Sequence, residues 1–449
     1  MGISPSRIGG MVEEFKKVAQ VLETCKPVNP AKQVPTDEFL RRQTAVADAV
    51  AKAGVDVGIV FSDEHYRGDV PYLGGNINVS IEQVAGVIGK TGFHIVAGLE
   101  GGYVAEQLAG RADATVHKVE LLQLADEKYP IDAERLEDVL EAANDGPVAR
   151  VGLLTPRQVI PAALVEYLED WLGKENVVDV QESYYEIKYE KSEAEMELIH
   201  DACQIADAMM KAMLVTLQPG MLETQVAGWA EFVAKELGAE SLGFKTMVGA
   251  NTANRTLIGP ALNREIREGD FVHLGVAPQR DGLTACVRRS VVAGTPTEDQ
   301  QYWLDFIESA YREGYRAYRE VAEKNFPAKY QEKALMDYFS AKSDEVSERI
   351  GRKVQLERQK PYTGTHNSGY TECQEFYGAI TLESDNPLGN QIVTMLDVAI
   401  RGIGNKWDDV VIPGLDFVVI ENTLGKFGPK VQQLNQLPNN VQHFVIGEG

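Results

Sequence analysis

The chain has 449 residues, which is enough for two or three domains of ordinary size. Apolar residues make up 44% of it and charged residues 25%, a composition typical of globular proteins that excludes a fibrous or disordered chain. With 67 acidic and 44 basic residues the formal net charge is −23, so neither nucleic acid nor an anionic membrane is an expected partner. We find no signal-peptide pattern and no apolar run approaching the ~18 residues of a membrane span, and therefore expect a cytoplasmic protein.

The first half of the chain alternates short apolar runs with amphipathic segments. The patterns predict helices over residues 37–53, 81–88, 101–109 and 162–172. They predict strands over residues 56–61, 94–98 and 149–154. Such βαβ alternation is typical of a sheet with helices on its faces.

The pattern changes after Tyr185. Apolar residues from Met196 to Met210 recur at helical spacing, and Ser192 with Glu195 forms a capping-box pattern before them. A second helix is expected over residues 223–237. Strands are expected over residues 271–276, 289–292, 392–400 and 417–421, with a helical insert over 298–350.

Several segments resemble the creatinase/aminopeptidase P superfamily, whose C-terminal domain has the pita-bread fold. The segments are KSEAEMELIHDACQIADAMM, QPGM, NREIREGDFVHLGVAPQRDGLTACVRRSVVAG, TGTHNSGYTECQE and, in the first half, VFSDEHYRGDVPYLGG. The resemblance implies an α/β (α+β) protein. A creatinase-like N-terminal βα domain with a helical N-terminal extension would span residues 1–184, and a pita-bread domain of the catalytic type would span residues 185–449.

Metallopeptidases of this superfamily hold two metal ions with two Asp on a hairpin, one His, and two Glu on later strands. Carried over position by position, the Asp fall on Gly275 and Cys286, the His on His366, and the Glu on Leu396 and Leu415. Two adjacent divalent cations repel each other unless anionic oxygens lie between them, so a lone imidazole cannot hold the pair. We therefore expect a metal-ligand-deficient member, closer to creatinase than to the metallopeptidases, with no metal or other cofactor.

A register shifted by one residue is the alternative. It places Asp397 and Asp416 at the two Glu positions and keeps a metal. Because side chains alternate across a strand, such a shift points the neighbouring residues to the opposite face.

The expected catalytic residues are His366, Glu372 and Cys373. His366 would act as a general acid and base oriented by Glu372, although a histidine with a purely structural role is the alternative. Cys373 lies seven residues after His366, where the family has a second, substrate-contacting His. It would be a nucleophile if His366 activated its thiol, and an inert side chain otherwise.

Further substrate contacts are expected around His366. Tyr370, His273 and Cys286 are candidates for the wall of the pocket. Arg289 sits where the family has a recurrent Arg and could bind a substrate carboxylate with both arms of its guanidinium group, or form an ordinary ion pair.

In the first half, His65, Tyr66 and Arg67 are also candidate substrate contacts. They occupy the stretch that, in creatinase-like dimers, reaches the active site of the partner subunit. The resemblance thus implies a homodimer in which the N-terminal domain covers the partner's pocket, and ordinary loop packing is the alternative.

The leading hypothesis is a metal-independent, creatinase-like hydrolase of a C–N bond in a small, carboxylated nitrogen compound. A non-catalytic pita-bread binding protein is one alternative. A metal-dependent peptidase or lyase of the same fold is the other.

Overall fold

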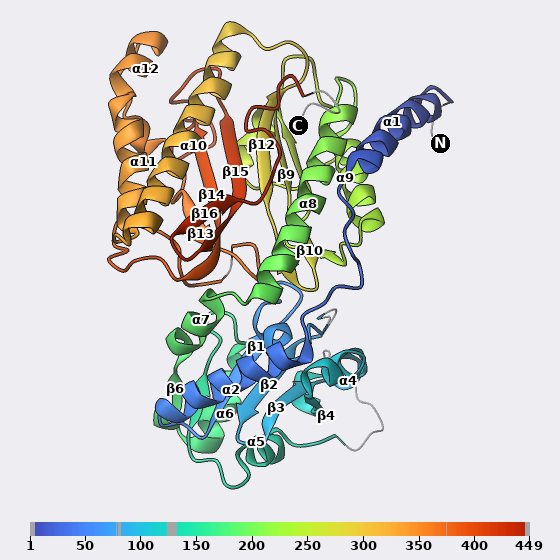
Figure 1. The fold of residues 1–449 in the computed structure, drawn as a ribbon, viewed down its shortest axis with the longest axis vertical. Helices are drawn as coiled ribbons and strands as arrows, with labels where there is room; N and C mark the ends of the chain where they lie inside the picture. Colours follow the sequence, from blue (N-terminus) through green and yellow to red (C-terminus); the bar gives the residue numbers. More distant parts are fainter. Residues whose placement is uncertain (1–4, 78, 80–81, 124–132, 374, 445–449) are drawn as a thin grey trace.

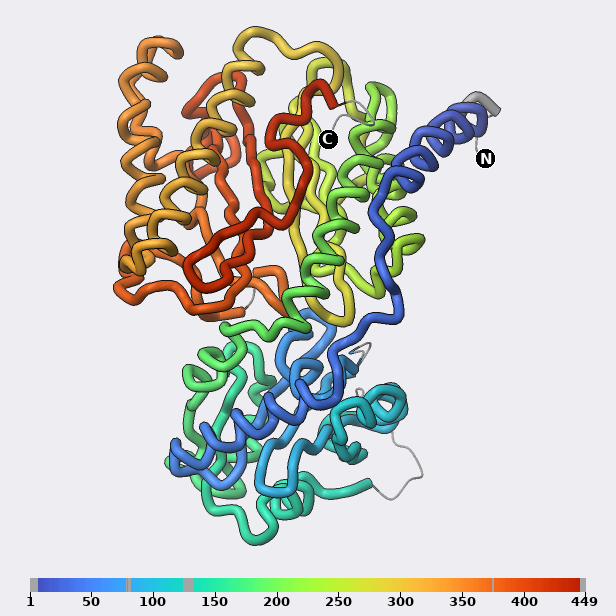
Figure 2. The backbone as a smooth tube through the Cα atoms, in the orientation of Figure 1, coloured from blue at the N-terminus to red at the C-terminus, as the bar shows by residue number. Residues whose placement is uncertain are grey.

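The chain folds into two lobes, each built on its own sheet (Figure 1). The structure is a computed structural model that describes residues 5–77, 79, 82–123, 133–373 and 375–444. The chain passes between the lobes twice, because α1 (Pro5–Thr24) packs on the upper lobe before the chain descends to the lower one (Figure 2). The predicted N-terminal extension is therefore helical, but it belongs spatially to the C-terminal lobe.

The lower lobe is a six-stranded sheet with helices on both faces. In spatial order its strands are β4 (Thr115–Lys118), β3 (Gly92–Ala97), β2 (Val84–Gly89), β1 (Val57–Ser62), β5 (Val151–Leu153) and β6 (Val177–Asp179). Its helices are α2 (Thr36–Lys52), α3 (Asp69–Leu73), α4 (Leu99–Glu106), α5 (Leu136–Asn144), α6 (Ala162–Leu172) and α7 (Gln181–Tyr189). Alternate residues of β1 enter opposite cores, with Ile59 and Phe61 in one and Val60 in the other.

One predicted helix of this lobe is wrong. Residues 84–89 form the strand β2, which is hydrogen-bonded to β1 on one edge and to β3 on the other. A short apolar run does not distinguish a buried strand from a buried helix, and here pairing on both edges decides. Ile81, where the predicted helix began, lies outside the described residues.

The upper lobe is built on a seven-stranded sheet. Its strands are β13 (Thr365–Asn367), β14 (Gln391–Arg401), β15 (Phe417–Phe427), β12 (Val287–Val292), β9 (Phe271–Val276) and β8 (Met247–Ala250), with β16 (Lys430–Gln433) also paired to β15. A small sheet of β11 (Leu283–Thr284), β10 (Pro278–Arg280) and β7 (Ser241–Leu242) lies beside it. The helices are α8 (Glu193–Thr216), α9 (Glu223–Glu236), α10 (Glu298–Lys324), α11 (Lys329–Ala341) and α12 (Ser343–Ile350). None of the described helices is both long and apolar enough to cross a bilayer.

Helices cover one face of the large sheet, and the other face carries both apolar and charged residues. Leu396 and Val398 of β14 pack in the core beside α10, and Leu274 of β9 packs in the core beside α8 and α9. The capping box expected at Ser192 is present, with Glu195 completing it at the start of α8. The cores behind the sheet hold the strand register, and thereby decide which residues face the other side.

Buried ion pairs join the two lobes. Lys188 at the end of α7 lies 3.0 Å from the Asp69 carboxylate and 2.9 Å from that of Glu375, and all three side chains are almost fully buried. Arg42 of α2 lies 3.1 Å from the Glu195 carboxylate of α8. Since Asp69 and Lys188 come from the lower lobe and Glu375 from the upper one, the ion pairs fix a loop of the upper lobe against the lower lobe.

We expect Lys188→Met to lower the free energy of unfolding by about 3–5 kcal/mol, because it leaves two buried carboxylates without their cation. Urea unfolding measures the change. The matched control is Lys333→Met, which removes an exposed ion pair with Asp337 and should cost less than about 1 kcal/mol. Equal effects of the two substitutions would contradict the role given to Lys188.

Leu396→Ala should lower the free energy of unfolding by about 2–5 kcal/mol, because it opens a cavity in a core where the side chain is fully buried. The control is Leu382→Ala, whose side chain is 49% exposed and whose loss should change stability by about 0.5 kcal/mol or less. A small effect at Leu396 would mean that this side chain faces away from the helices.

Candidate functional site

A row of side chains crosses the open face of the large sheet. The register pairs Asp397 of β14 with Glu421 of β15, Glu421 with Arg288 of β12, Arg288 with Gly275 of β9, and Gly275 with Met247 of β8. Directly paired residues of neighbouring antiparallel strands point to the same face. Two carboxylates and a guanidinium group therefore meet in the interior of the protein, where each is at most 5% exposed.

His366 of β13 lies on the same face of the sheet. It pairs with Met395, and Met395 shares a face with Asp397 because the two are two residues apart on β14, so the His366 ring points toward the row of charged side chains. Its Nε2 atom lies 3.6 Å from a carboxylate oxygen of Glu372 and 3.6 Å from Glu421 Oε1. Burial alone would lower the pKa of His366, but the carboxylates of Glu421, Glu372 and Asp397 outweigh it and raise the pKa to about 10. Without a bound cation, the imidazole is therefore held in its protonated form.

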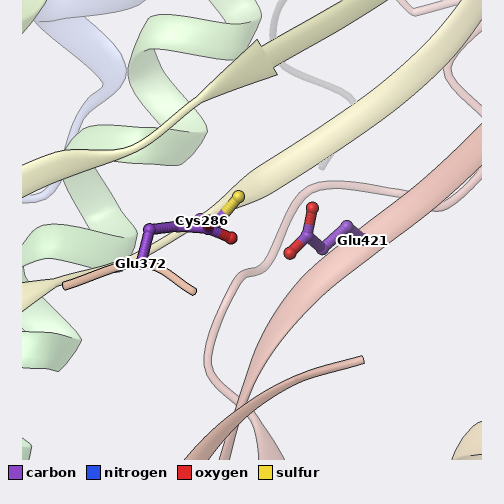
Figure 3. A group of neighbouring side chains, drawn as sticks. All are labelled: Cys286, Glu372 and Glu421. Carbon is purple, nitrogen blue, oxygen red and sulfur yellow. The ribbon is translucent and has the colours of Figure 1, made fainter. Parts of the chain in front are cut away.

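Cys286, Glu372 and Glu421 form a second group on the same face. Their side chains point toward one another from β15, from the residue before β12, and from the loop after β13 (Figure 3). Burial and the two carboxylates raise the pKa of the Cys286 thiol far above its ordinary value. Cys286 is consequently a neutral thiol in this environment.

The donor atoms of His366, Asp397 and Glu421 suit one divalent cation, and Glu421 is shared with the group of Cys286 and Glu372. One donor atom each from His366, Asp397 and Glu421 lies within 4.8 Å of the others. Among the described residues, no group donates a hydrogen bond to the buried Glu421 Oε1. Imidazole and carboxylate donors of this kind hold a single catalytic cation with a coordination position left open. The two Asp ligands that the resemblance placed on the hairpin are missing, because Gly275 has no side chain and Cys286 has no carboxylate.

Two cavities lie next to this group and share Cys373 in their linings. One of about 720 Å³ lies between the lobes and is lined by His65, Arg67, Tyr370, Glu372 and Cys373, among others. The other, of about 370 Å³, is lined by His366, Cys373 and the segment 375–379. Cys373 lines both cavities and Glu372 contacts His366, so the chemical group is accessible from a space large enough for a small ligand.

The positions expected for the two Glu ligands were wrong, and so was the expectation of an apolar site. Leu396 points into the helix-covered core, while its neighbour Asp397 points to the site. Leu415 precedes β15 altogether, and Glu421 occupies the site position on that strand. The shifted register is thus correct for Asp397, but not for Asp416, which forms an ion pair with Arg255. A single Glu inside the apolar run FVVIENTL was the available signal for Glu421.

Two of the expected substrate contacts, Arg289 and His273, are buried and form hydrogen bonds inside the protein instead. Arg289 is fully buried and donates to the main-chain oxygens of Glu421, Leu437 and Pro438 and to Asn422 Oδ1. It therefore holds the C-terminal segment and has no free arm for a carboxylate. His273 accepts a hydrogen bond from Arg288 Nε at 3.0 Å, and burial together with Arg288 lowers its pKa.

The remaining candidates lie nearer the cavities. Tyr370 lines the cavity between the lobes, but its hydroxyl accepts a hydrogen bond from Arg42 at 2.8 Å. Tyr66 is buried, with its hydroxyl 3.3 Å from that of Tyr185, so only its neighbours His65 and Arg67 line the cavity. Partial burial of the sulfur and the Glu372 carboxylate raise the pKa of Cys373, which disfavours the thiolate that a nucleophile requires.

Part of the chain is similar to a family of peptidases. Residues 197–370 match the model of metallopeptidase family M24. An Xaa-Pro dipeptidase of Pyrococcus horikoshii is 26% identical over 217 residues, which are 48% of this chain and 60% of that protein. An Xaa-Pro dipeptidase of Pyrococcus furiosus is 26% identical over 153 residues, which are 33% of this chain and 44% of the relative. The chain thus aligns with about half the length of these curated relatives.

Solved structures match over much more of the chain. The prolidase from Pyrococcus horikoshii superposes with a TM-score of 0.68 at 16% identity and covers 90% of this chain and 100% of its own. The X-Pro aminopeptidase from Thermotoga maritima gives a TM-score of 0.68 at 17% identity, with coverage of 89% and 99%. The expected closeness to creatinase is not supported, because these relatives are peptidases. The chain therefore has the two-domain fold of these solved structures, with an N-terminal domain and a C-terminal pita-bread domain, and residues 197–370 are similar to metallopeptidase family M24.

Proposed function

We propose that the protein is a hydrolase that cleaves the amide C–N bond of short peptides with the help of one divalent cation. The observation that carries the proposal is the buried group of His366, Asp397 and Glu421, in which Glu421 Oε1 has His366 Nε2 at 3.6 Å and receives no shorter hydrogen bond from the described part of the chain. The names of the relatives, Xaa-Pro dipeptidases, suggest short peptides as the substrate class.

His366, Asp397 and Glu421 would hold the cation, which when bound would polarise the substrate carbonyl and acidify water. Glu372 faces both the cavity and His366, and is placed to take a proton from the attacking water. The water oxygen bonds to the carbonyl carbon, the C–N bond breaks, and the proton passes to the leaving nitrogen. His65 and Arg67 would offer positive or hydrogen-bonding groups to a carboxylate at the far end of the substrate.

A metal-independent hydrolase is the second candidate, and one observation favours it. Arg288 already forms an ion pair with two of the three donor residues, at 2.9 Å from Asp397 and 3.5 Å from Glu421. Removal of metal separates the two candidates.

We expect purified protein to hydrolyse Xaa-Pro or other dipeptides, to lose this activity on treatment with a chelator, and to recover it with Mn²⁺, Co²⁺ or Zn²⁺. Glu421→Gln and His366→Asn should each lower kcat/KM by about 100-fold or more, because each removes a ligand. The control Glu348→Gln changes an exposed carboxylate and should leave kcat/KM unchanged.

Activity that survives complete metal removal would favour the second candidate. The absence of hydrolysis across dipeptides, guanidino acids and lactams, with and without metal, would leave neither candidate standing and would point to a binding protein.

We also propose a homodimer, which the resemblance to creatinase-like dimers supports. In the structure His65 and Arg67 line the cavity of their own chain. Light scattering after gel filtration should give about twice the 49.4 kDa of the chain. A single species at the mass of one chain would contradict the dimer.

A further inference from the structure

The Arg288 guanidinium group is held from all sides. Its Nη1 lies 2.9 Å from Asp397 Oδ2, 3.5 Å from Glu421 Oε2 and 3.2 Å from the Tyr362 hydroxyl. Its Nε donates to His273 at 3.0 Å, and its Nη2 donates to the main-chain oxygen of Leu257 at 2.6 Å. These contacts fix the side chain and place its positive charge beside the carboxylates of Asp397 and Glu421.

The surroundings of Arg288 are built for it. Leu257, whose carbonyl accepts from Nη2, has a φ of +64°, a conformation that is unfavourable for a bulky residue. Gly275 lies opposite Arg288 on β9, and a Cβ atom added there would come within 3.1 Å of Arg288 Cγ and 3.3 Å of Met247. A Cβ atom at position 275 would therefore crowd Arg288, and one of the two side chains would have to shift by a few tenths of an ångström.

Charge accounts for the arrangement. Asp397 and Glu421 are cross-strand neighbours with almost no exposure to water, and two such carboxylates repel unless a cation lies between them. Arg288 uses one oxygen of each. The atoms left over are Glu421 Oε1, His366 Nε2 and Asp397 Oδ1, which the Tyr362 hydroxyl contacts at 3.2 Å. These atoms are enough for one small cation.

We infer that Arg288 is a resident cation that occupies the place of a second metal ion in this group, so that removing it opens a new cation site between Asp397 and Glu421. The inference rests on the proposed function only for the single cation expected in the wild-type protein. It makes Arg288 a positioning residue for the two carboxylates, with no direct part in bond cleavage.

The test counts Co²⁺ ions. Wild type, Arg288→Ala, Arg288→Lys and the double variant Arg288→Ala/Asp397→Asn are stripped with chelator and titrated with Co²⁺. Bound metal is measured by elemental analysis and by visible absorption, and the melting temperature is recorded with and without Co²⁺.

We expect Arg288→Ala to bind one Co²⁺ ion more than wild type. We also expect the substitution to lower the melting temperature and added Co²⁺ to restore part of that loss. Arg288→Lys keeps a positive charge and should gain no ion. The double variant also lacks the Asp397 carboxylate, which would contact both ions, and should bind fewer Co²⁺ ions than Arg288→Ala.

Equal Co²⁺ binding by wild type and Arg288→Ala would overturn the inference. So would two ions in the wild-type group, a measurement that does not depend on whether the variant folds. If wild type binds no ion and Arg288→Ala binds one, the inference is supported and the proposed single-cation function is contradicted. If each protein binds one ion, the single-cation function is supported and the inference is contradicted.

Discussion

The arrangement of the site depends on one electrostatic constraint: two buried carboxylates on neighbouring strands need a positive charge between them. Asp397 and Glu421 are fixed as neighbours by the pairing of β14 with β15, and neither can turn toward water. Arg288 supplies the charge from the next strand, and His366 supplies a second positive charge from the adjacent row. The carboxylates are thereby compensated without solvent, and His366 lines a cavity.

Burial on the far side of the sheet is what makes this constraint effective. Residues that alternate with the charged ones, such as Leu396 and Ile420, are packed into the core beside α10. A slip of one residue would bury the charges in that core and expose the leucines, which costs far more than any local rearrangement. By fixing the strand register, the hydrophobic core thus also fixes the face on which Asp397 and Glu421 lie.

The loop after β13 contacts both the site and the lower lobe. The loop after β13 carries Glu372 and Cys373 toward the site and Glu375 toward Lys188 of the lower lobe. Opposite charges that are almost fully buried make this contact a rigid one. A change in how the lobes are packed would therefore move Glu372, which relates the cavity between the lobes to the chemistry behind it.

The amino-acid sequence by itself determined the architecture, most helices and strands, and the place of His366, because hydrophobic periodicity, capping residues and motif order are local properties. It also determined that Gly275 and Cys286 cannot supply carboxylates. Only the tertiary structure decided that Asp397 and Glu421 face the site, that Arg288 lies between them, and that Arg289 does not. Which face a buried strand residue occupies depends on partners far away in the chain, and β14 and β15 are apolar on both faces, so their own sequences carry too little alternation to fix it.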